Sequence, residues 1–284
     1  MLPVADFHQD NVFVDGILER LYEAGYRLVV GAAWPLQGGE IWDYDRTVEG
    51  VRWFLEELER SPNSRLLTDL QACDTRHMNL IVGLEGGYLN ALEAYERLYD
   101  MGVRLFTLTW NVDSSLSTSC CGERKGRGGL TPLGREFLAW AKGRDVLVDI
   151  AHASYDAMYE VMESGVKFLY SHGGVVESPD SQRLLTYDIA GEIIKSGGVV
   201  GVGYGSIFFG DITLEDLAER IVELYGRFGG GIVSGSDFFG LGGSEYRGIE
   251  RVEDIHNLLR LLPEDIRERF AWTEAQSFLR KPVP

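Results

Sequence analysis

The sequence has little of what marks secreted or membrane proteins. Its 284 residues include only three cysteines, Cys73, Cys120 and Cys121, and an odd number without a CxxC pair is a poor disulfide framework. The opening residues, MLPVADFHQD, contain neither the basic nor the apolar segment of a signal peptide. No apolar run approaches the ~18 residues of a membrane span. These absences predict a reducing, cytoplasmic setting and no membrane partner.

Positive charge is also scarce. The chain has 44 Asp and Glu against 27 Lys and Arg, which gives a formal net charge of -17. A surface of this sign repels phosphate backbones, so we exclude nucleic acid as a partner. A hydrophobic share of 45% with a charged share of 25% fits a folded globular protein and excludes a disordered one.

Short apolar segments recur from one end of the chain to the other. They are rich in Val, Ile, Leu and Phe, and they are nearly continuous rather than alternating with polar residues. Strands that are buried on both faces have this pattern, which is typical of a parallel sheet. The eight expected strands are 3–7, 27–32, 79–84, 104–109, 146–150, 167–170, 199–202 and 231–235.

Amphipathic segments with apolar residues at i, i+3, i+4 and i+7 alternate with these strands, and several end at glycine. The expected helices are 16–23, 47–60, 89–101, 131–142, 155–164, 188–196, 213–226 and 252–262, with one or two more in 263–281. Strict alternation predicts an α/β fold, either a closed (β/α)8 TIM barrel with extra C-terminal helices or a large doubly wound sheet. No linker divides the chain, so we expect one domain over 1–284.

Histidine is rare and unevenly placed. Three of the five histidines, His8, His152 and His172, directly follow or end expected strands. Functional residues of a barrel collect at this end of the strands. The other two, His77 before a strand and His256 inside a helix, are expected to be structural or surface residues.

Carboxylates occupy equivalent positions, because Asp10, Glu85 and Asp237 also stand at strand ends. The i, i+2 spacing of His8 and Asp10 turns both side chains the same way on an extended segment, although an HxD motif alone is weak. Imidazole and carboxylate together suit zinc and neighbouring transition metals. The combined set therefore predicts one shared metal site at the carboxyl ends of the strands.

A series of motifs in this order resembles the membrane (renal) dipeptidase family, peptidase family M19, of the amidohydrolase superfamily. The motifs are DFHQD from Asp6, LEGG from Leu84, GVRLFTLT from Gly102, GLTPLG from Gly129, VDIAHAS from Val148, LYSHG from Leu169, SQRLLTYD around Arg183 and GSDFFG from Gly235. The resemblance covers nearly the whole chain. It implies a metal-dependent hydrolase barrel that acts as a metallo-dipeptidase.

The resemblance also implies roles for single residues. His8 and Asp10 would bind one divalent metal, expected to be Zn²⁺, and His152 and His172 would bind a second. Glu85 would bridge the two metals and hold a bridging hydroxide as nucleophile, which is sensible because two metals lower the pKa of bound water. Asp237 would carry the proton to the leaving amine.

The implied substrate is a small dipeptide-like molecule whose carboxylate Arg183 would hold, since a guanidinium fork matches two oxygens. A loop-anchoring ion pair is the equally weighted alternative for Arg183. Oligomeric state is left open, with a homodimer as one arrangement.

Two positions depart from the family motifs. Trp110 stands where the family has a substrate-contacting histidine, and indole offers a donor but no acceptor. Phe239 replaces the second acid of the family's GSDFDG, while Asp237 is kept. We expect Trp110 to reshape the substrate pocket, either by lining it or by blocking part of it, and to shift the substrate preference.

Three functions stay open from the sequence. The first is a dinuclear zinc dipeptidase, which Arg183 favours. The second is the same chemistry on another small amide, ester or lactone, such as a β-lactam or an N-acyl amino acid, which Trp110 favours. The third is a metal-binding pseudoenzyme. The retention of Asp237 argues against it, because binding alone needs no proton carrier.

Overall fold

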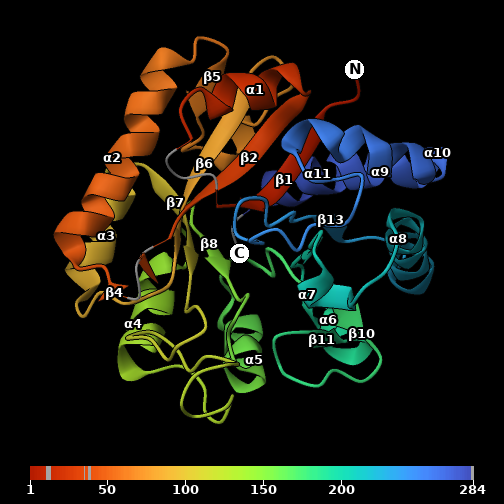
Figure 1. Ribbon diagram of the computed structural model, residues 1–284. Helices are drawn as coiled ribbons and strands as arrows, with labels where there is room; N and C mark the ends of the chain where they lie inside the picture. Colours follow the sequence, from red (N-terminus) through yellow and green to blue (C-terminus); the bar gives the residue numbers. More distant parts are fainter. Residues whose placement is uncertain (11–13, 35, 38–39, 283–284) are drawn as a thin grey trace.

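The computed structural model describes residues 1–10, 14–34, 36–37 and 40–282, and in this part of the chain eight parallel strands form a closed barrel (Figure 1). They are β1 (Val4–Gln9), β2 (Tyr26–Ala33), β6 (Met78–Glu85), β7 (Val103–Thr107), β8 (Leu147–Asp149), β9 (Phe168–Leu169), β12 (Val200–Val202) and β13 (Ile232–Ser234). Strands β1 to β9 pair in that order, and β12 pairs with β13. Parallel bridges Tyr170–Val200 and Gln9–Phe238 close the ring. The expected (β/α)8 barrel is confirmed.

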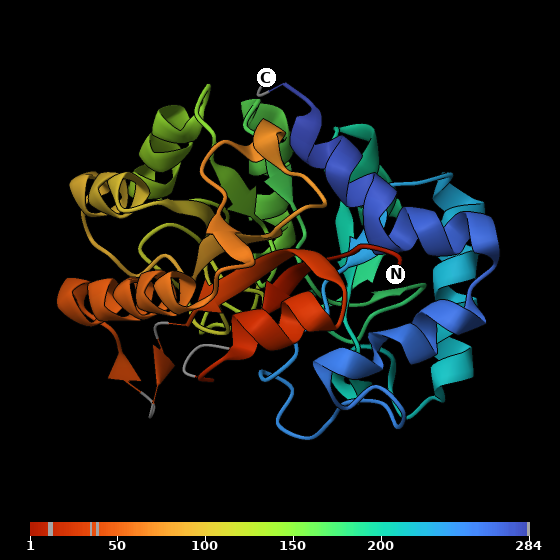
Figure 2. The ribbon, with the colours of Figure 1, turned by 90° about the horizontal axis from the view of Figure 1, so that it is seen from above.

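One main helix follows each of these strands and packs outside the barrel (Figures 1 and 2). The eight are α1 (Ile17–Glu23), α2 (Tyr44–Arg60), α3 (Leu92–Asp100), α4 (Pro132–Ala141), α5 (Tyr155–Ser164), α6 (Tyr187–Lys195), α8 (Leu214–Phe228) and α9 (Ile255–Leu261). Their starts follow the sequence: Ser154 caps α5 by accepting from the Ala157 N–H, and Thr213 forms a capping box with Asp216 on α8. No helix in the described part of the chain combines the length and apolar character that a membrane span requires.

Several short elements were not expected. They are the antiparallel pair β3 (Leu36–Gln37) and β4 (Glu40–Ile41), the strand β5 (Ser64–Leu66), the pair β10 (Val175–Val176) and β11 (Leu185–Thr186), helix α7 (Ser206–Phe209) and a 3-10 turn at Leu70–Ala72. A second 3-10 turn, Val252–Asp254, forms the start of the expected helix 252–262. Elements of two to four residues are too short for hydrophobic periodicity to reveal. The tail forms α10 (Glu264–Glu268), one turn of π-helix (Arg269–Thr273) and α11 (Glu274–Arg280), as expected for extra C-terminal helices.

The buried apolar residues alternate along each strand between two clusters. One set fills the barrel interior, for example Leu28, Ile81 and Leu147, and the other packs under the helices, for example Val29 and Val148. This explains why the strand sequences are continuously apolar. The interior cluster is completed by Trp272, Phe278 and Leu279 from the C-terminal segment, which covers the amino ends of the strands. The opposite, carboxyl ends are therefore the free end of the barrel.

Candidate metal centre

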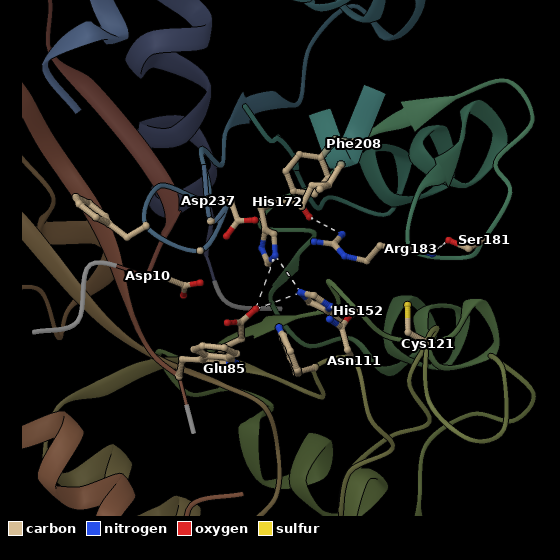
Figure 3. Close-up of a pocket in the computed structure, with 16 residues that line it drawn as sticks. Asp10, Glu85, Asn111, Cys121, His152, His172, Ser181, Arg183, Phe208 and Asp237 are labelled. Carbon is tan, nitrogen blue, oxygen red and sulfur yellow. Dashed lines mark hydrogen bonds and ion pairs between the residues drawn. The ribbon is translucent and has the colours of Figure 1, made fainter. Parts of the chain in front are cut away.

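Six side chains predicted from the sequence meet at the carboxyl ends of the strands. His8 lies in β1 with Asp10 just after it, and Glu85 ends β6. His152, His172 and Asp237 each stand three residues beyond the ends of β8, β9 and β13. Figure 3 shows Glu85, His152, His172 and Asp237 turned toward a common space. Residues up to 229 positions apart in the chain thus form one cluster.

The distances within the cluster are short. The Glu85 carboxylate oxygen Oε1 lies 3.2 Å from Nε2 of His152, 3.6 Å from Nε2 of His8 and 3.7 Å from Nε2 of His172. Nε2 of His8 is also 3.4 Å from Asp10 Oδ1. The rings of His8 and His172 stack with centroids 3.7 Å apart. Three overlapping groups of possible ligands result: His8, Asp10 and Glu85; Glu85, His152 and His172; and His8, His172 and Asp237.

Several buried atoms of this cluster have no hydrogen-bond partner. Among the described residues these include both ring nitrogens of His8, Oδ1 of Asp10 and Oε2 of Glu85. An unpaired buried polar atom costs about 1–3 kcal/mol, and native proteins contain few of them. Nε2 of His8 and the carboxylates of Asp10 and Glu85 lie close together, which indicates that a cation is the partner they are arranged to hold.

The outer nitrogens of two histidines are held by neighbouring polar groups. Nδ1 of His152 lies 2.9 Å from Oδ1 of Asn111, and Nδ1 of His172 lies 2.8 Å from Oγ of Ser171. The Ser171 hydroxyl donates to Asp149 Oδ2 at 2.7 Å, so it accepts from His172. Such bonds fix the tautomer and turn Nε2 toward the centre. Sequence reasoning gave these residues no role, although all of them directly flank strand ends.

The backbone is strained at this end of the barrel. His152 has φ 63°, Asp237 φ 62° and Phe239 φ 72°, and Lys125 is the one other residue besides glycine with positive φ in the described chain. Each such conformation costs on the order of 1–3 kcal/mol and persists where the surroundings enforce it. Gly240 completes the arrangement, because a Cβ there would collide with the carboxylates of Asp10 and Asp237.

Burial and neighbouring charge shift the pKa values of the cluster. Burial, followed by the nearby Asp10, raises the pKa of Glu85 well above its usual range. Burial also lowers the pKa of His152 and of His172 far below the usual imidazole value, which favours the neutral form that metals bind. For His8, burial opposes the charge, but the Glu85 and Asp10 carboxylates outweigh it and raise the pKa to about 10. The carboxylates of Glu85 and Asp10 thus favour a positive charge at this point.

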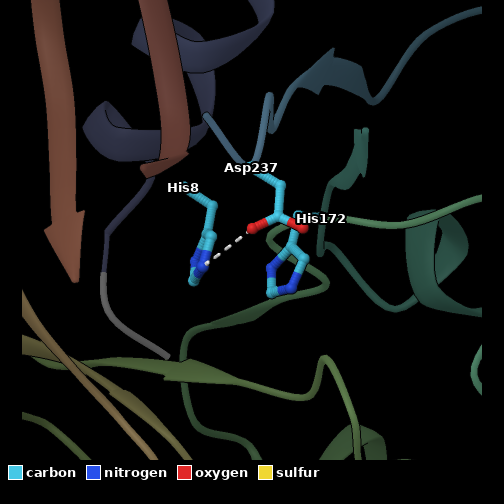
Figure 4. A group of neighbouring side chains, drawn as sticks. All are labelled: His8, His172 and Asp237. Atoms are coloured by element: carbon cyan, nitrogen blue, oxygen red, sulfur yellow. Dashed lines mark ion pairs between the residues drawn. The ribbon is translucent and has the colours of Figure 1, made fainter. Parts of the chain in front are cut away.

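Asp237 lies at the edge of the cluster, farther from His8 than Asp10 and Glu85 are. Its Oδ1 is 3.8 Å from Nε2 of His8 (Figure 4). Burial, and then the Asp10 charge, raises the pKa of Asp237 to about 7. A carboxyl group with such a pKa can both accept and release a proton near neutral pH.

A cavity of about 570 Å³ opens above the cluster. Among the described residues that line it, Arg183 is the one cation. Its Nη1 donates to the Tyr170 hydroxyl at 3.0 Å and to the His172 carbonyl at 3.2 Å, and no carboxylate of the described chain forms an ion pair with it. The described residues therefore offer Arg183 no partner for its alternative role, a loop-anchoring ion pair. Trp110 also lines the cavity, with its ring centroid 6.1 Å from that of His152.

The two remaining histidines lie elsewhere, as expected. His77 contacts Asp74 at 3.4 Å before β6, and His256 contacts the Ala24 carbonyl at 2.8 Å. The two vicinal cysteines, however, belong to the cavity region: Cys121 lines it, and its Sγ is 3.3 Å from that of buried Cys120. A hydrogen bond from Cys120 lowers the pKa of Cys121 to about 6.

Comparisons with known proteins show the family and the fold of the chain. The family model described as membrane dipeptidase (peptidase family M19) matches residues 44–280, a segment that holds Glu85, His152, His172 and Asp237 and begins after His8. An uncharacterized dipeptidase of Schizosaccharomyces pombe is 25% identical over 184 residues, which are 62% of this chain and 43% of the relative. The chain thus matches less than half of that relative's length.

Two solved structures have the same fold. One is a dipeptidase described as a metallopeptidase of family M19, with a TM-score of 0.86, 17% identity and 99% of both chains covered. The other is a metallopeptidase from Rhodobacter sphaeroides bound to a phosphinate mimic of the dipeptide L-Ala-D-Ala, with a TM-score of 0.87, 17% identity and 99% of both chains covered.

Proposed function

This chain belongs to the membrane dipeptidase family, peptidase family M19, and on that premise we propose that it is a metal-dependent dipeptidase. It hydrolyses the amide bond of dipeptides or similar small substrates with a free carboxylate. The observation that carries the proposal is that buried ligand atoms of His8, Asp10 and Glu85, several of them without a hydrogen-bond partner, lie together with the imidazoles of His152 and His172.

The donor set fits two divalent cations, with zinc as the expected metal. His8 and Asp10 would hold one ion, His152 and His172 the other, and Glu85 would be shared. The central position of Glu85 supports this division, since its Oε1 is within 3.7 Å of Nε2 of all three histidines. A mixture of imidazole and carboxylate ligands is typical of zinc in hydrolases. When bound, such a pair supplies a water of lowered pKa and polarises the substrate carbonyl.

The chain's own residues complete the reaction. Asp237 takes a proton from the attacking water on a carboxylate oxygen and delivers it to the nitrogen of the leaving amine. Its position beside His8 and within the cavity lining supports this role. Asn111 and Ser171 keep the His152 and His172 rings oriented. Arg183 binds the substrate carboxylate with its free guanidinium nitrogens, as the absence of an ion-pair partner among the described residues supports.

A second candidate is the same chemistry on another small amide, ester or lactone. Trp110 favours it, because an indole stands beside His152 where the family motif has histidine. A metal-binding pseudoenzyme is the third candidate. The crystallised Rhodobacter sphaeroides metallopeptidase holds a dipeptide mimic, so dipeptides are the first substrates to test here.

Metal analysis of the purified protein tests the centre itself. We expect about two zinc ions per chain, and clearly fewer in a Glu85→Ala variant, because Glu85 is the shared ligand. His77→Ala is the matched control and should keep the full metal content, since His77 contacts only Asp74 and lies before β6. A protein that binds no divalent metal, or a Glu85→Ala variant with unchanged content, would contradict the proposal.

A further inference from the structure

Apolar side chains line two opposite sides of the cavity. In the ring of strands, Trp34 follows β2 and Trp110 follows β7, on either side of β6. Ile207 and Phe208 follow β12, which is the fifth strand from β2 and lies opposite β6 in an eight-strand ring. The cavity is therefore a slot between an indole wall and an opposing Ile207–Phe208 wall, with the metal centre as its floor.

The indole wall is a fixed surface. The rings of Trp34 and Trp110 meet edge to face with centroids 5.0 Å apart. The backbone N–H of Trp110 donates to the Tyr88 hydroxyl at 3.2 Å, and its carbonyl accepts from Ser119 Oγ at 2.5 Å. A preorganised aromatic wall binds apolar groups at low entropic cost.

The rim carries exposed apolar side chains as well. Ile207 is 57% exposed and Phe239 is 42% exposed, and both line the cavity. Exposed apolar residues gathered at a cavity mark contact with an apolar ligand. The two departures from the family motifs, Trp110 and Phe239, thus both put an aromatic ring into this one cavity.

Charge fixes the direction in which a substrate lies. The guanidinium of Arg183 is 5.2 Å from the Phe208 ring, so the substrate carboxylate belongs at the Phe208 side (Figure 3). Of the carboxylates that line the cavity, Asp10 and Glu85 belong to the metal centre and Asp237 stands beside it. The indole wall therefore faces the acyl side of the scissile amide and offers no partner for a charged side chain.

We propose that this site selects substrates with a large apolar group on the acyl side of the amide and a free carboxylate on the amine side. For a dipeptide, this means an aromatic or branched aliphatic first residue; an N-acyl amino acid with an apolar acyl group has the same chemistry. The inference rests on the proposed function, and it adds the substrate class that Trp34 and Trp110 recognise.

The test compares dipeptides that differ only in the first residue. With the zinc-loaded protein, kcat/KM for L-Phe-L-Ala should exceed that for Gly-L-Ala and L-Asp-L-Ala by about tenfold to a hundredfold, the effect of burying one aromatic side chain. Trp34→Ala and Trp110→Ala should each reduce the Phe-to-Gly ratio severalfold. Trp140→Phe on α4, outside the cavity, is the control and should keep the wild-type ratio. A ratio within one preparation does not depend on the fraction of folded protein.

The outcomes separate the two proposals. Hydrolysis of all three peptides with similar or reversed kcat/KM would overturn the substrate class and leave the dipeptidase function standing. Hydrolysis of none of them would overturn the proposed function and the inference with it. A Phe-to-Gly ratio that both tryptophan variants leave unchanged would also overturn the inference, because Trp34 and Trp110 would then not cause the preference for an apolar first residue.

A separate observation concerns the thiols at the edge of the cavity. Cys121 is exposed and Cys120 is buried, and their sulfurs are 3.3 Å apart. The backbone N–H of Cys120 donates to the His152 carbonyl at 2.8 Å, and that of Cys121 donates to Ser119 Oγ at 3.1 Å. The pair, which lies between β7 and α4, is therefore held against the segment that carries His152.

The geometry assigns Cys120 and Cys121 as a site of reversible oxidation by a hydroperoxide. The exposed Cys121 sulfur is oxidised to a sulfenic acid with release of one water from hydrogen peroxide. The Cys120 thiol then attacks that sulfur, an S–S bond forms and a second water leaves, so that the two thiols lose two electrons and two protons in all.

Intact mass analysis of the whole protein after brief peroxide treatment tests this. We expect a loss of about 2 Da that dithiothreitol reverses, which Cys73→Ser retains and both Cys120→Ser and Cys121→Ser abolish. A stable gain of oxygen without loss of 2 Da, or no reaction at all, would overturn the assignment.

Discussion

The two ends of the barrel are built from neighbouring residues with opposite properties. At the closed end, Phe7 of β1 packs edge to face on Phe278 of α11, with ring centroids 5.9 Å apart. One residue further along β1, His8 faces the carboxylates of Asp10 and Glu85, and neither of its ring nitrogens has a hydrogen-bond partner. At the closed end, apolar side chains of the C-terminal segment cover the strands. The open end keeps strained backbone and unpaired polar atoms together.

This contrast shows how stability and function are divided along the same strands. Apolar burial and the C-terminal segment hold the barrel closed at one end, so the other end can keep an arrangement that would be costly by itself. Lys167 strengthens the closed end, because its Nζ donates to the carbonyls of Leu279 at 2.6 Å and Lys281 at 2.8 Å. Substitutions at the two ends should therefore give different signatures.

The largest effect is expected from Asp237→Asn at the open end. Removal of the proposed proton carrier should lower kcat by about 10²- to 10⁴-fold and leave the metal content unchanged. Asparagine tolerates the positive φ of this position, so the backbone should not change. Steady-state kinetics and metal analysis on one sample are the measurements. Asp100→Asn, on the surface of α3, is the control, and a fully active Asp237→Asn variant would exclude the role.

Phe278→Ala at the closed end should act on stability alone. Phe278 is 1% exposed, and its truncation should cost about 3–5 kcal/mol in the free energy of unfolding. Denaturant titration measures this, while metal content per folded chain should stay the same. Phe239→Ala is the matched substitution at the open end, where the ring is 42% exposed. If Phe239→Ala destabilised as much as Phe278→Ala, the contrast between the ends would be lost.

Trp110→His tests whether the indole at the open end limits dipeptide hydrolysis. It restores a side chain that can accept a hydrogen bond beside His152, and we expect dipeptide turnover to rise by about threefold to tenfold, the size of one hydrogen bond. Kinetics on Gly-L-Ala, which makes little use of the indole wall, measures this most directly. An unchanged rate would show that Trp110 lines the cavity without limiting dipeptide hydrolysis.

A further prediction concerns pH at the closed end. Burial lowers the pKa of Lys167 to about 8 from an ordinary value of 10.5. Between these two values the unfolded chain binds more protons than the folded one, so the free energy of unfolding gains a rising contribution of at most about 1.4 kcal/mol per pH unit. Denaturant titrations from pH 8 to 10.5 should show a steeper rise for the wild type than for Lys167→Met. Parallel curves would contradict the assignment.

The sequence predicted the barrel well because its signals are local and repeated. All eight barrel strands and the helix after each were expected within a few residues, since a strand buried on both faces gives a continuous apolar segment. Helix α11 was expected as a helix, but its position under the barrel was not. The apolar pattern around Phe278 indicates a buried helix face and does not indicate that Phe7 is its partner.

The candidate site was predictable to a similar extent. His8, Glu85 and His172 were expected together because strand ends meet at one rim of a barrel. Asn111 and Ser171 were not assigned roles, since a hydrogen bond to an outer ring nitrogen depends on side-chain geometry that spacing does not encode. The opposing apolar walls were missed for the same reason: Trp34 and Phe208 are distant in sequence and meet across the cavity only after the barrel closes.

The central claim is that the open end of the barrel is a metal-dependent dipeptidase centre. The most direct test is hydrolysis of a panel of L,L- and L,D-dipeptides by the zinc-loaded protein, with a chelated sample of the same preparation beside it. We predict cleavage that the chelator abolishes and that added zinc restores. Cleavage that survives complete removal of metal, or a zinc-loaded protein that cleaves no member of the panel, would contradict the account.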